Sequence, residues 1–453
     1  MRILNEEYIP QVKREKPFLL FLLACLIISL ACLDANNMLN ISASLKEGYH
    51  AYFGSTYNKY FQLLTIFLIY VYRDYLCPSH RGMRLRYQKW YLWWTCLLVL
   101  CGLVIISNRV EYYQWIDGSI SLLEPILIWL FFRPDVSEKV MSFFYRYSWI
   151  PFLALFVWQL GFTEFFLQPF VFLICIFPLF PKRVALCVIL FAMLYATNDV
   201  QNERAPLIKG VVAFLTGIVV LFRNKIPLKI FKIGRKFCFA SVLVLLVYIF
   251  SDLFMFVTGR LSSNDALFNQ ETSETSFKSD TRSLIYIDVI NSSVKHGYYI
   301  WGRTPTRGFD IDISGALFFS GSLLSSNDFN KGERHKNEMV HTNVFDWEGL
   351  IGLYLFSMIY VMASYWGVFY SRNRIIPILA CYIGWRWAWG FVEDVNNFMV
   401  LNVDLWLTMA ICYSPYFRNM TDDEFKIWAR GLLSTKYRKI FNRNFAEKYY
   451  LTE

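Results

Sequence analysis

Long apolar segments recur along the chain, separated by short polar ones. Each apolar window is close to 20 residues, the length that a helix needs to cross the hydrocarbon core of a membrane, about 30 Å thick. We expect about twelve such spans, at 18–38, 57–77, 88–107, 112–132, 147–163, 165–180, 183–198, 204–222, 236–257, 347–370, 375–392 and 397–417. Hydrophobic residues make up 56% of the 453 residues and charged residues only 18%, a balance that a soluble protein of this length does not need. The pattern therefore predicts an all-α, polytopic integral membrane protein that forms one domain over residues 1–453.

Basic residues gather in short connectors between the predicted spans. The connector 223–236 contains six Lys or Arg and no acidic residue, and basic residues also fill the connectors after 77, 180 and 370. Because positive residues stay on the cytoplasmic side, we expect these connectors, both chain ends and the basic tail 418–453 in the cytoplasm. The first apolar run has no small-residue cleavage site after it, so it is expected to remain as a helix. Orientation accounts for most of the net charge of +10, and no nucleic-acid partner is expected.

The segment 258–346 is the longest polar stretch, and this topology places it on the extracytoplasmic side. From Asp280 we expect an amphipathic helix on the membrane or against the spans, because apolar residues recur at helical spacing. These residues are Leu284, Ile287, Ile290 and Val294. Turn-forming residues follow at Gly302, Pro305, Gly308 and Gly315. The sequence therefore predicts a loop with its own structure, of the kind that closes over a site in a membrane domain.

The cysteines indicate neither a disulfide framework nor a metal site. All ten lie in or near the predicted spans, and none lies in 258–346. No Cys-x-x-Cys or His/Cys cluster has the spacing of a zinc site. We therefore expect no metal and no cofactor.

A histidine and an asparagine stand where the polar segment meets the next span, in HTNVFDWEGLIGLYLF (341–356). The histidine places an ionisable side chain at a membrane surface, where chemistry on a lipid-borne substrate would occur. Two other segments precede it. NERAPLIKGVVAFLTG (202–217) begins a span with an arginine, and RSLIYIDVINSSVKHGYYIWGRTPTRGF (282–309) is an arginine-led helix that runs into a glycine-rich turn.

With these three segments in this order, the chain resembles the O-antigen polymerase and O-antigen ligase superfamily. These are membrane glycosyltransferases that act on polyprenyl-diphosphate-linked glycans. The resemblance covers residues 202–370 and the overall pattern of spans. Four features depart from it. Glu203 stands where the family commonly has serine, and Thr342 separates His341 from Asn343, which are usually adjacent. Val340 precedes His341 where the family often has proline, and the glycine turn is degenerate. The resemblance implies a GT-C-like helical fold with one large structured extracytoplasmic loop.

The resemblance also implies a function in the bacterial inner membrane, with an active site that faces the periplasm. A polymerase would transfer a polyprenyl-diphosphate-linked glycan onto the next lipid-linked repeat unit of a surface polysaccharide. A protein that regulates chain length is a further expected partner. We favour the polymerase because the chain departs from the ligase-like His-Asn pattern. Two alternatives remain open: a ligase that moves the finished glycan to a lipid or protein acceptor, and a flippase or transporter of the lipid-linked unit.

Three residues are the candidates for catalysis. The diphosphate leaves with growing negative charge, which the guanidinium groups of Arg204 and Arg282 can stabilise without a metal. The acceptor hydroxyl needs a base that works near neutral pH, which His341 can supply. Each also has a structural interpretation: Arg204 as a snorkelling interfacial residue, Arg282 as a solvated helix start, and His341 as a cap of the next span.

Further residues are candidates for substrate binding, and they lie in the lid segment or in the outer parts of the spans. They are Asn343, Asp346, Arg303, Arg307, Lys209, Arg386 and Trp385. Asn343 or Asp346 can orient the histidine or the sugar, and Trp385 can stack on a sugar ring or join the interfacial aromatic belt. Four charges inside apolar runs indicate either a shared polar cavity or internal ion pairs: Lys209, Asp252, Arg386 and Asp404.

Overall fold

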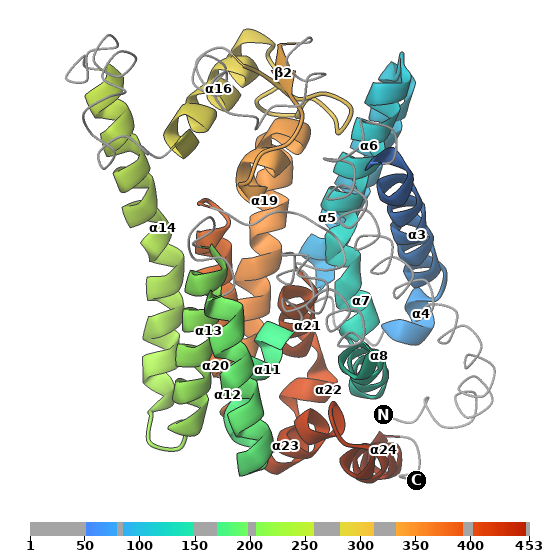
Figure 1. Cartoon of the computed structure of the whole chain (residues 1–453), viewed down its shortest axis with the longest axis vertical. Coiled ribbons are helices and arrows are strands. Elements are labelled where there is room, and N and C mark those ends of the chain that lie inside the picture. The colour runs from blue at the N-terminus through green and yellow to red at the C-terminus, as the bar shows by residue number, and fades with distance from the viewer. Residues whose placement is uncertain are drawn as a thin grey trace.

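The chain folds into helices that run side by side, with a helix and a short hairpin lying across one end (Figure 1). The structure is a computed structural model, and it describes residues 51–78, 85–147, 170–197, 205–257, 281–311, 332–392 and 402–449. The helices of the first half are α3 (Ala51–Val71), α4 (Arg73–Leu76), α5 (Arg86–Ile105), α6 (Arg109–Leu123), η2 (Glu124–Ile126), α7 (Leu127–Phe131), α8 (Pro134–Tyr147), α11 (Val171–Cys175), η4 (Phe177–Leu179), α12 (Lys182–Thr197) and α13 (Ala205–Leu221). Those of the second half are α14 (Leu228–Val257), α16 (Thr281–Lys295), α19 (Val340–Phe369), α20 (Ile376–Trp389), α21 (Val403–Tyr413), α22 (Pro415–Arg418), α23 (Asp422–Gly431) and α24 (Thr435–Tyr449). Strand β1 (Phe309–Asp310) pairs antiparallel with β2 (Glu333–Arg334).

Helix α19 lies at the centre of the bundle and packs against α5, α14, α20 and α21 (Figure 1). A small residue allows one of these close approaches. A Cβ atom at Gly367 would lie 2.7 Å from the Cβ of Ala380 and 2.9 Å from the Sγ of Cys412. Small residues let helix backbones approach each other in this way in apolar surroundings.

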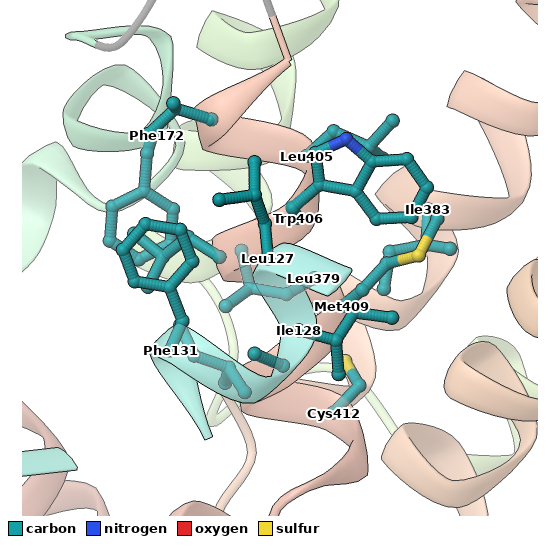
Figure 2. Close-up of a cluster of buried hydrophobic side chains, with 14 of the residues drawn as sticks. Leu127, Ile128, Phe131, Phe172, Leu379, Ile383, Leu405, Trp406, Met409 and Cys412 are labelled. Carbon is teal, nitrogen blue, oxygen red and sulfur yellow. The ribbon is translucent and has the colours of Figure 1, made fainter. Parts of the chain in front are cut away.

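The hydrophobic core surrounds α21, whose residues from Val403 to Tyr413 are all buried. A helix that is buried on every side can be apolar on every side, which explains the almost continuous apolar sequence of α21. Figure 2 shows side chains from α7, α11, α20 and α21 meeting in this core. The labelled residues are Leu127, Ile128, Phe131, Phe172, Leu379, Ile383, Leu405, Trp406, Met409 and Cys412.

Among the described residues, two helices are long and apolar enough to cross a membrane: Arg86–Ile105 and Val340–Phe369. The number rises to three if Arg109–Phe131 and Pro134–Arg146 are counted as one span, although the chain bends by 116° between them. Shorter apolar helices are Lys59–Val71, Leu207–Leu221 and Val403–Tyr413. The described part of the chain therefore contains fewer full-length spans than the sequence pattern predicts.

Individual predicted spans show where the pattern differs from the structure. The described part of 165–180 contains the five-residue α11 and the three-residue η4, because Pro178 interrupts helical bonding. The segment 112–132 is a continuous helical path with a 3-10 turn at Glu124–Ile126, where Pro125 removes a backbone donor. The span predicted at 18–38, and the span predicted at 147–163 beyond Tyr147, lie outside the described residues.

Two of the basic connectors, 223–236 and the one after 370, meet at one end of the bundle, opposite α16 and the hairpin (Figure 1). Residues 79–84, in the connector after 77, lie outside the described residues. Arg374 donates to the carbonyl of Asn224 at 3.0 Å, and Arg223 pairs with Asp422 at 2.7 Å. The predicted tail 418–453 forms α23 and α24 there, and Thr421 begins α23 with a capping box. These two connectors and the described part of the tail are therefore adjacent at one end of the fold.

The described parts of the predicted loop, residues 281–311 and 332–339, are called the lid below. The helix expected from Asp280 is confirmed as α16, and its apolar residues lie on two neighbouring faces. Ile285 and Val289 are buried against Phe309 and Met339, whereas Ile290 and Val294 are 41% and 66% exposed. The spacing of apolar residues does not show which of these two neighbouring faces is buried by the lid. That depends on contacts with the hairpin, which follows α16 in the chain.

Candidate functional site

The lid docks onto a break in α19 at Gly349. This residue has φ +67° and ψ −167°, so the helix stops and restarts there. The amides of Leu350 and Ile351 donate to the carbonyls of Tyr299 and Ile300 in the lid, at 2.9 and 3.3 Å. The two helix segments therefore use the lid as a bonding partner where their own helical bonds are interrupted.

The lid also donates backbone hydrogen bonds to the first segment of α19. The amides of Arg303 and Thr304 donate to the carbonyls of Asp346 and Trp347, at 2.8 and 3.1 Å. Gly302 has φ +82°, and a Cβ atom there would collide with the Trp347 carbonyl. The glycine-rich turn expected from the sequence is thus the part of the lid that fits against the broken helix. Gly315 lies outside the described residues.

His341, near the start of α19, lies in an aromatic enclosure. Its Nε2 atom is 2.8 Å from the carbonyl oxygen of Trp387, and only 2% of the residue is exposed. The Phe391 ring is 4.0 Å from the imidazole, centroid to centroid, and the rings of Phe356 and Tyr360 also contact it. A substrate hydroxyl could reach His341 only after one of these aromatic groups moves aside.

Helix α16 contacts Phe391, whose ring covers His341. The Tyr286 hydroxyl donates to the carbonyl of Phe391 at 2.6 Å. Arg282 lies one helical turn before Tyr286, so its place on α16 is on the side that approaches the His341 enclosure. Its side chain is not described. Arg204, the other predicted arginine, lies outside the described residues.

Asn343 fixes the chain that leads into α19. Its Oδ1 accepts the amide of Asn337 at 2.9 Å, and its Nδ2 donates to the carbonyl of the same residue at 2.9 Å. The Thr342 hydroxyl donates to Asn337 Oδ1 at 2.7 Å. Both side chains are buried, and their bonds hold the lid at Asn337 to the start of α19.

Asp346 faces the lid from the turn of α19 just before the break. Its Oδ1 atom accepts the Tyr298 hydroxyl at 2.8 Å, and that hydroxyl is also 2.8 Å from Ser292 Oγ. Only 1% of Asp346 is exposed. The contact therefore joins α16, the glycine-rich turn and α19 through one buried carboxylate.

An ion cluster covers the lid near this contact. Asp310 accepts from Lys295 and His296, both at 2.8 Å, and from Arg303 at 3.1 Å. Partial burial raises the pKa of Asp310, but the three hydrogen bonds outweigh it and lower the pKa to about 2. Asp310 is therefore ionised throughout the physiological range.

Two arginines of this cluster are held differently. Arg303 pairs with Asp310 and, through Nη2, with Glu333 at 2.9 Å, and its side chain is 16% exposed. Arg307 lies 3.8 Å from both Glu111 and Glu333, and its side chain is 37% exposed. Arg303 is thus saturated with protein contacts, whereas Arg307 presents an accessible guanidinium that is only loosely held.

Two of the four charges in apolar runs, Arg386 and Asp404, belong to an internal network. The Nη1 atom of Arg386 pairs with Asp404 Oδ2 at 2.9 Å and its Nη2 atom donates to Asn402 Oδ1 at 3.0 Å. Asn402 and Trp406 in turn donate to Glu124 Oε2, at 3.1 and 3.0 Å. Every member of the network is buried, which matches the interpretation as an internal ion pair for Arg386 and Asp404.

The remaining residues predicted in apolar runs or for substrate binding lie on α13, α14 and α20. Lys209 is buried in α13, with 5% of the residue exposed. Trp385 stacks on Trp389 at 5.8 Å with an interplanar angle of 20° and also contacts Tyr382. The side chain of Asp252 is not described.

Several residues of the site carry no signal in the sequence. Tyr298, Asp310, Glu333 and Glu111 come from four separate elements, and only the docked lid brings them near the predicted arginines. Among the residues that the structure describes, no three His, Cys, Asp or Glu side chains approach one another closely enough to hold a metal ion. Comparison with known proteins found no family model, no curated protein and no solved structure that matches the chain.

Proposed function

We propose that the protein is a membrane glycosyltransferase that polymerises a polyprenyl-diphosphate-linked glycan, in the bacterial inner membrane with the lid facing the periplasm. One observation carries the proposal. A lid that bears arginines is docked by backbone hydrogen bonds onto the same segment of an apolar helix that bears His341. Such an arrangement brings cations and an imidazole to the head-group level, where a lipid-linked diphosphate lies.

In this proposal Arg307 makes first contact with the donor diphosphate. A phosphate oxygen is a stronger partner for a guanidinium than a carboxylate 3.8 Å away. Arg282, on the side of α16 near the His341 enclosure, and Arg204 are proposed as further diphosphate ligands. As the diphosphate leaves, these charges stabilise it without a metal.

His341 is the proposed base for the acceptor hydroxyl. Its enclosure by Phe391 and Trp387 implies that the acceptor must displace an aromatic group before transfer. An enclosed base excludes water, and water would otherwise hydrolyse the activated donor. Asp346, fixed through Tyr298, holds the lid in position over this segment.

The polymerase is favoured over a transporter by the state of the intramembrane charges. Charged side chains along a transport pathway face a cavity within the membrane. Arg386 and Asp404 instead pair with each other and are buried. The ligase alternative uses the same donor chemistry and differs only in the acceptor. A chain-length regulator would then act on the polymerase from the periplasmic side.

The test is polymerisation by the purified protein in proteoliposomes that contain a lipid-linked repeat unit. The expected product is a ladder, while transfer of one glycan to a lipid or protein acceptor would indicate a ligase. Arg307→Ala and His341→Ala should each lower the rate by about 10²-fold or more. Arg307→Lys should recover part of the activity, because it restores the charge without the planar fork.

Arg109→Ala is the matched control, because Arg109 is an exposed arginine on the same helix as Glu111, and its guanidinium donates to the Tyr113 hydroxyl at 3.2 and 3.1 Å. It should leave the ladder unchanged. Thermal unfolding of each variant separates loss of folding from loss of chemistry. Normal ladders from both Arg307→Ala and His341→Ala would remove the support for the proposal.

A further inference from the structure

The lid turn Tyr299–Trp301 docks at a definite height on α19. Gly349, beside which the turn lies, precedes the last residue of the helix, Phe369, by 20 residues. At 1.5 Å per residue this separation is about 30 Å, the thickness of the hydrocarbon core of a membrane. The chain after Phe369 contains Arg372 and Arg374, which mark the opposite polar boundary. Measured along α19, the turn is therefore about 30 Å from the opposite polar boundary.

The side chains of this turn are apolar or aromatic, and they are exposed. Tyr299, Ile300 and Trp301 are 45%, 38% and 58% exposed. The Trp301 ring lies 5.7 Å from that of Trp94 on the membrane-spanning helix α5, centroid to centroid. Leu350, which bonds to the turn through its amide, is 52% exposed. The exposed apolar surface of the turn is thus continuous with the apolar surface of the two spans.

Two carbonyls of the turn have hydrogen-bond partners within the protein. A peptide group that leaves water needs a hydrogen-bond partner within the protein. The carbonyls of Tyr299 and Ile300 accept amides of α19, and the amide of Gly302 donates to the Tyr298 carbonyl at 2.7 Å. The helix break at Gly349 supplies these partners, because it frees amides that a continuous helix would use itself.

We propose that Tyr299–Trp301 inserts into the membrane leaflet on the lid side, with phospholipid at the acyl-chain and head-group boundary as its partner. Aromatic residues favour this zone because their rings prefer a partly apolar environment. The turn then fastens the lid to the membrane as well as to α19, and it sets the height of the Arg303 and Arg307 cluster above the bilayer. This inference rests on height, exposure and backbone pairing, and it does not depend on the proposed activity.

The test uses the full-length protein with its native cysteines replaced, reconstituted into phosphatidylcholine–phosphatidylglycerol nanodiscs. Single cysteines at Trp301 or Ile300 carry an environment-sensitive fluorophore. A matched control is Glu338→Cys, since Glu338 belongs to the same lid and its side chain is 45% exposed. Quenching is measured with lipids that carry a nitroxide near the head group or near the chain end, and with aqueous iodide.

At positions 301 and 300 we expect strong quenching by the shallow nitroxide lipid and an iodide quenching constant about tenfold smaller than at position 338, because the hydrocarbon boundary excludes anions. Equal iodide quenching at all three positions would overturn the proposal. Weak quenching by both iodide and nitroxide lipid at 301 and 300 would also overturn it, because the turn would then be covered by protein. Two separate positions and thermal unfolding of each labelled variant guard against a local effect of replacing the Trp301 ring.

Discussion

Replacing one member of the Arg386–Asp404 pair should destabilise the whole bundle. The two side chains are each 1% exposed and are joined at 2.9 Å. Arg386→Met leaves Asp404 without this guanidinium and removes the donor to Asn402, which itself donates to Glu124. Removing one partner of a buried ion pair typically costs about 3–5 kcal/mol, because the remaining charge is left in a low-dielectric environment.

The double variant Arg386→Met with Asp404→Leu should be close to the parent protein. Apolar residues of similar volume often replace a buried pair at little net cost, within about 1–2 kcal/mol. A double-mutant cycle therefore isolates the interaction: each single variant loses stability, and the second change restores it. The free energy of unfolding is measured by reversible denaturation in mixed micelles, followed by tryptophan fluorescence.

Lys448→Met is the control for this cycle. Lys448 pairs with Glu424 at 2.7 Å, but the side chains are 38% and 35% exposed, so its loss should cost only about 0–1 kcal/mol. If Arg386→Met costs less than about 1 kcal/mol and the two changes add, the charges are solvated rather than paired. That result would revive the shared polar cavity and with it the transporter alternative.

Three further predictions concern the lid and the chemistry. Gly349→Ala should loosen the lid to proteolysis, because a Cβ atom would collide with the Ile300 carbonyl, whereas Gly297→Ala, at a similar φ of +71° in open space, should cost only about 1 kcal/mol. Asp310→Asn should lower the thermal stability at pH 7, and the difference from the parent should shrink from about pH 4 downward as the native carboxylate approaches its pKa of about 2. The sign follows because a lowered carboxyl pKa stabilises the folded state only while the group is ionised, so a gap that persists at the lowest pH would contradict it. Polymerisation should continue in EDTA, and loss of activity that Mg²⁺ restores would refute the metal-free mechanism.

The local elements that depend on nearby residues could be predicted from the sequence. Asp280 and the following apolar repeat predict a helix, and α16 (Thr281–Lys295) confirms it. The glycines at 302 and 308 predict a turning segment, which the structure contains. Both rest on backbone preferences that act over a few residues, such as capping and positive φ.

Features that depend on distant residues could not be predicted. In the sequence, Gly349 is only an interruption of an apolar run. The need for glycine there comes from the distant Ile300 and Gly302, whose backbone atoms leave no space for a Cβ atom. The buried face of α16 depends on Phe309 in β1, which no repeat within the helix reveals. Apolar length alone also does not separate a membrane span from a buried core helix such as α21 (Val403–Tyr413), which is equally apolar.

Glu124 illustrates the same limit for charge. The sequence indicates a lone acid inside a span and assigns it no role. Its partners Asn402 and Trp406 lie 278 and 282 positions away in the chain, and both donate from neutral groups, an amide and an indole. Glu124 Oε2 is thus bonded by residues that the sequence does not mark as neighbours.

Different residues of the lid attach it to the bundle and present its accessible charge. Backbone hydrogen bonds to α19 hold the turn, and the Tyr298–Asp346 contact and the Tyr286–Phe391 bond hold the rest. Arg307 contributes only contacts of 3.8 Å to this attachment. Because the lid does not rely on it, Arg307 can exchange its carboxylates for a phosphate without undocking the segment that covers His341. An arginine that served only to attach the lid would have little exposed surface and be fully paired with carboxylates, as Arg303 is.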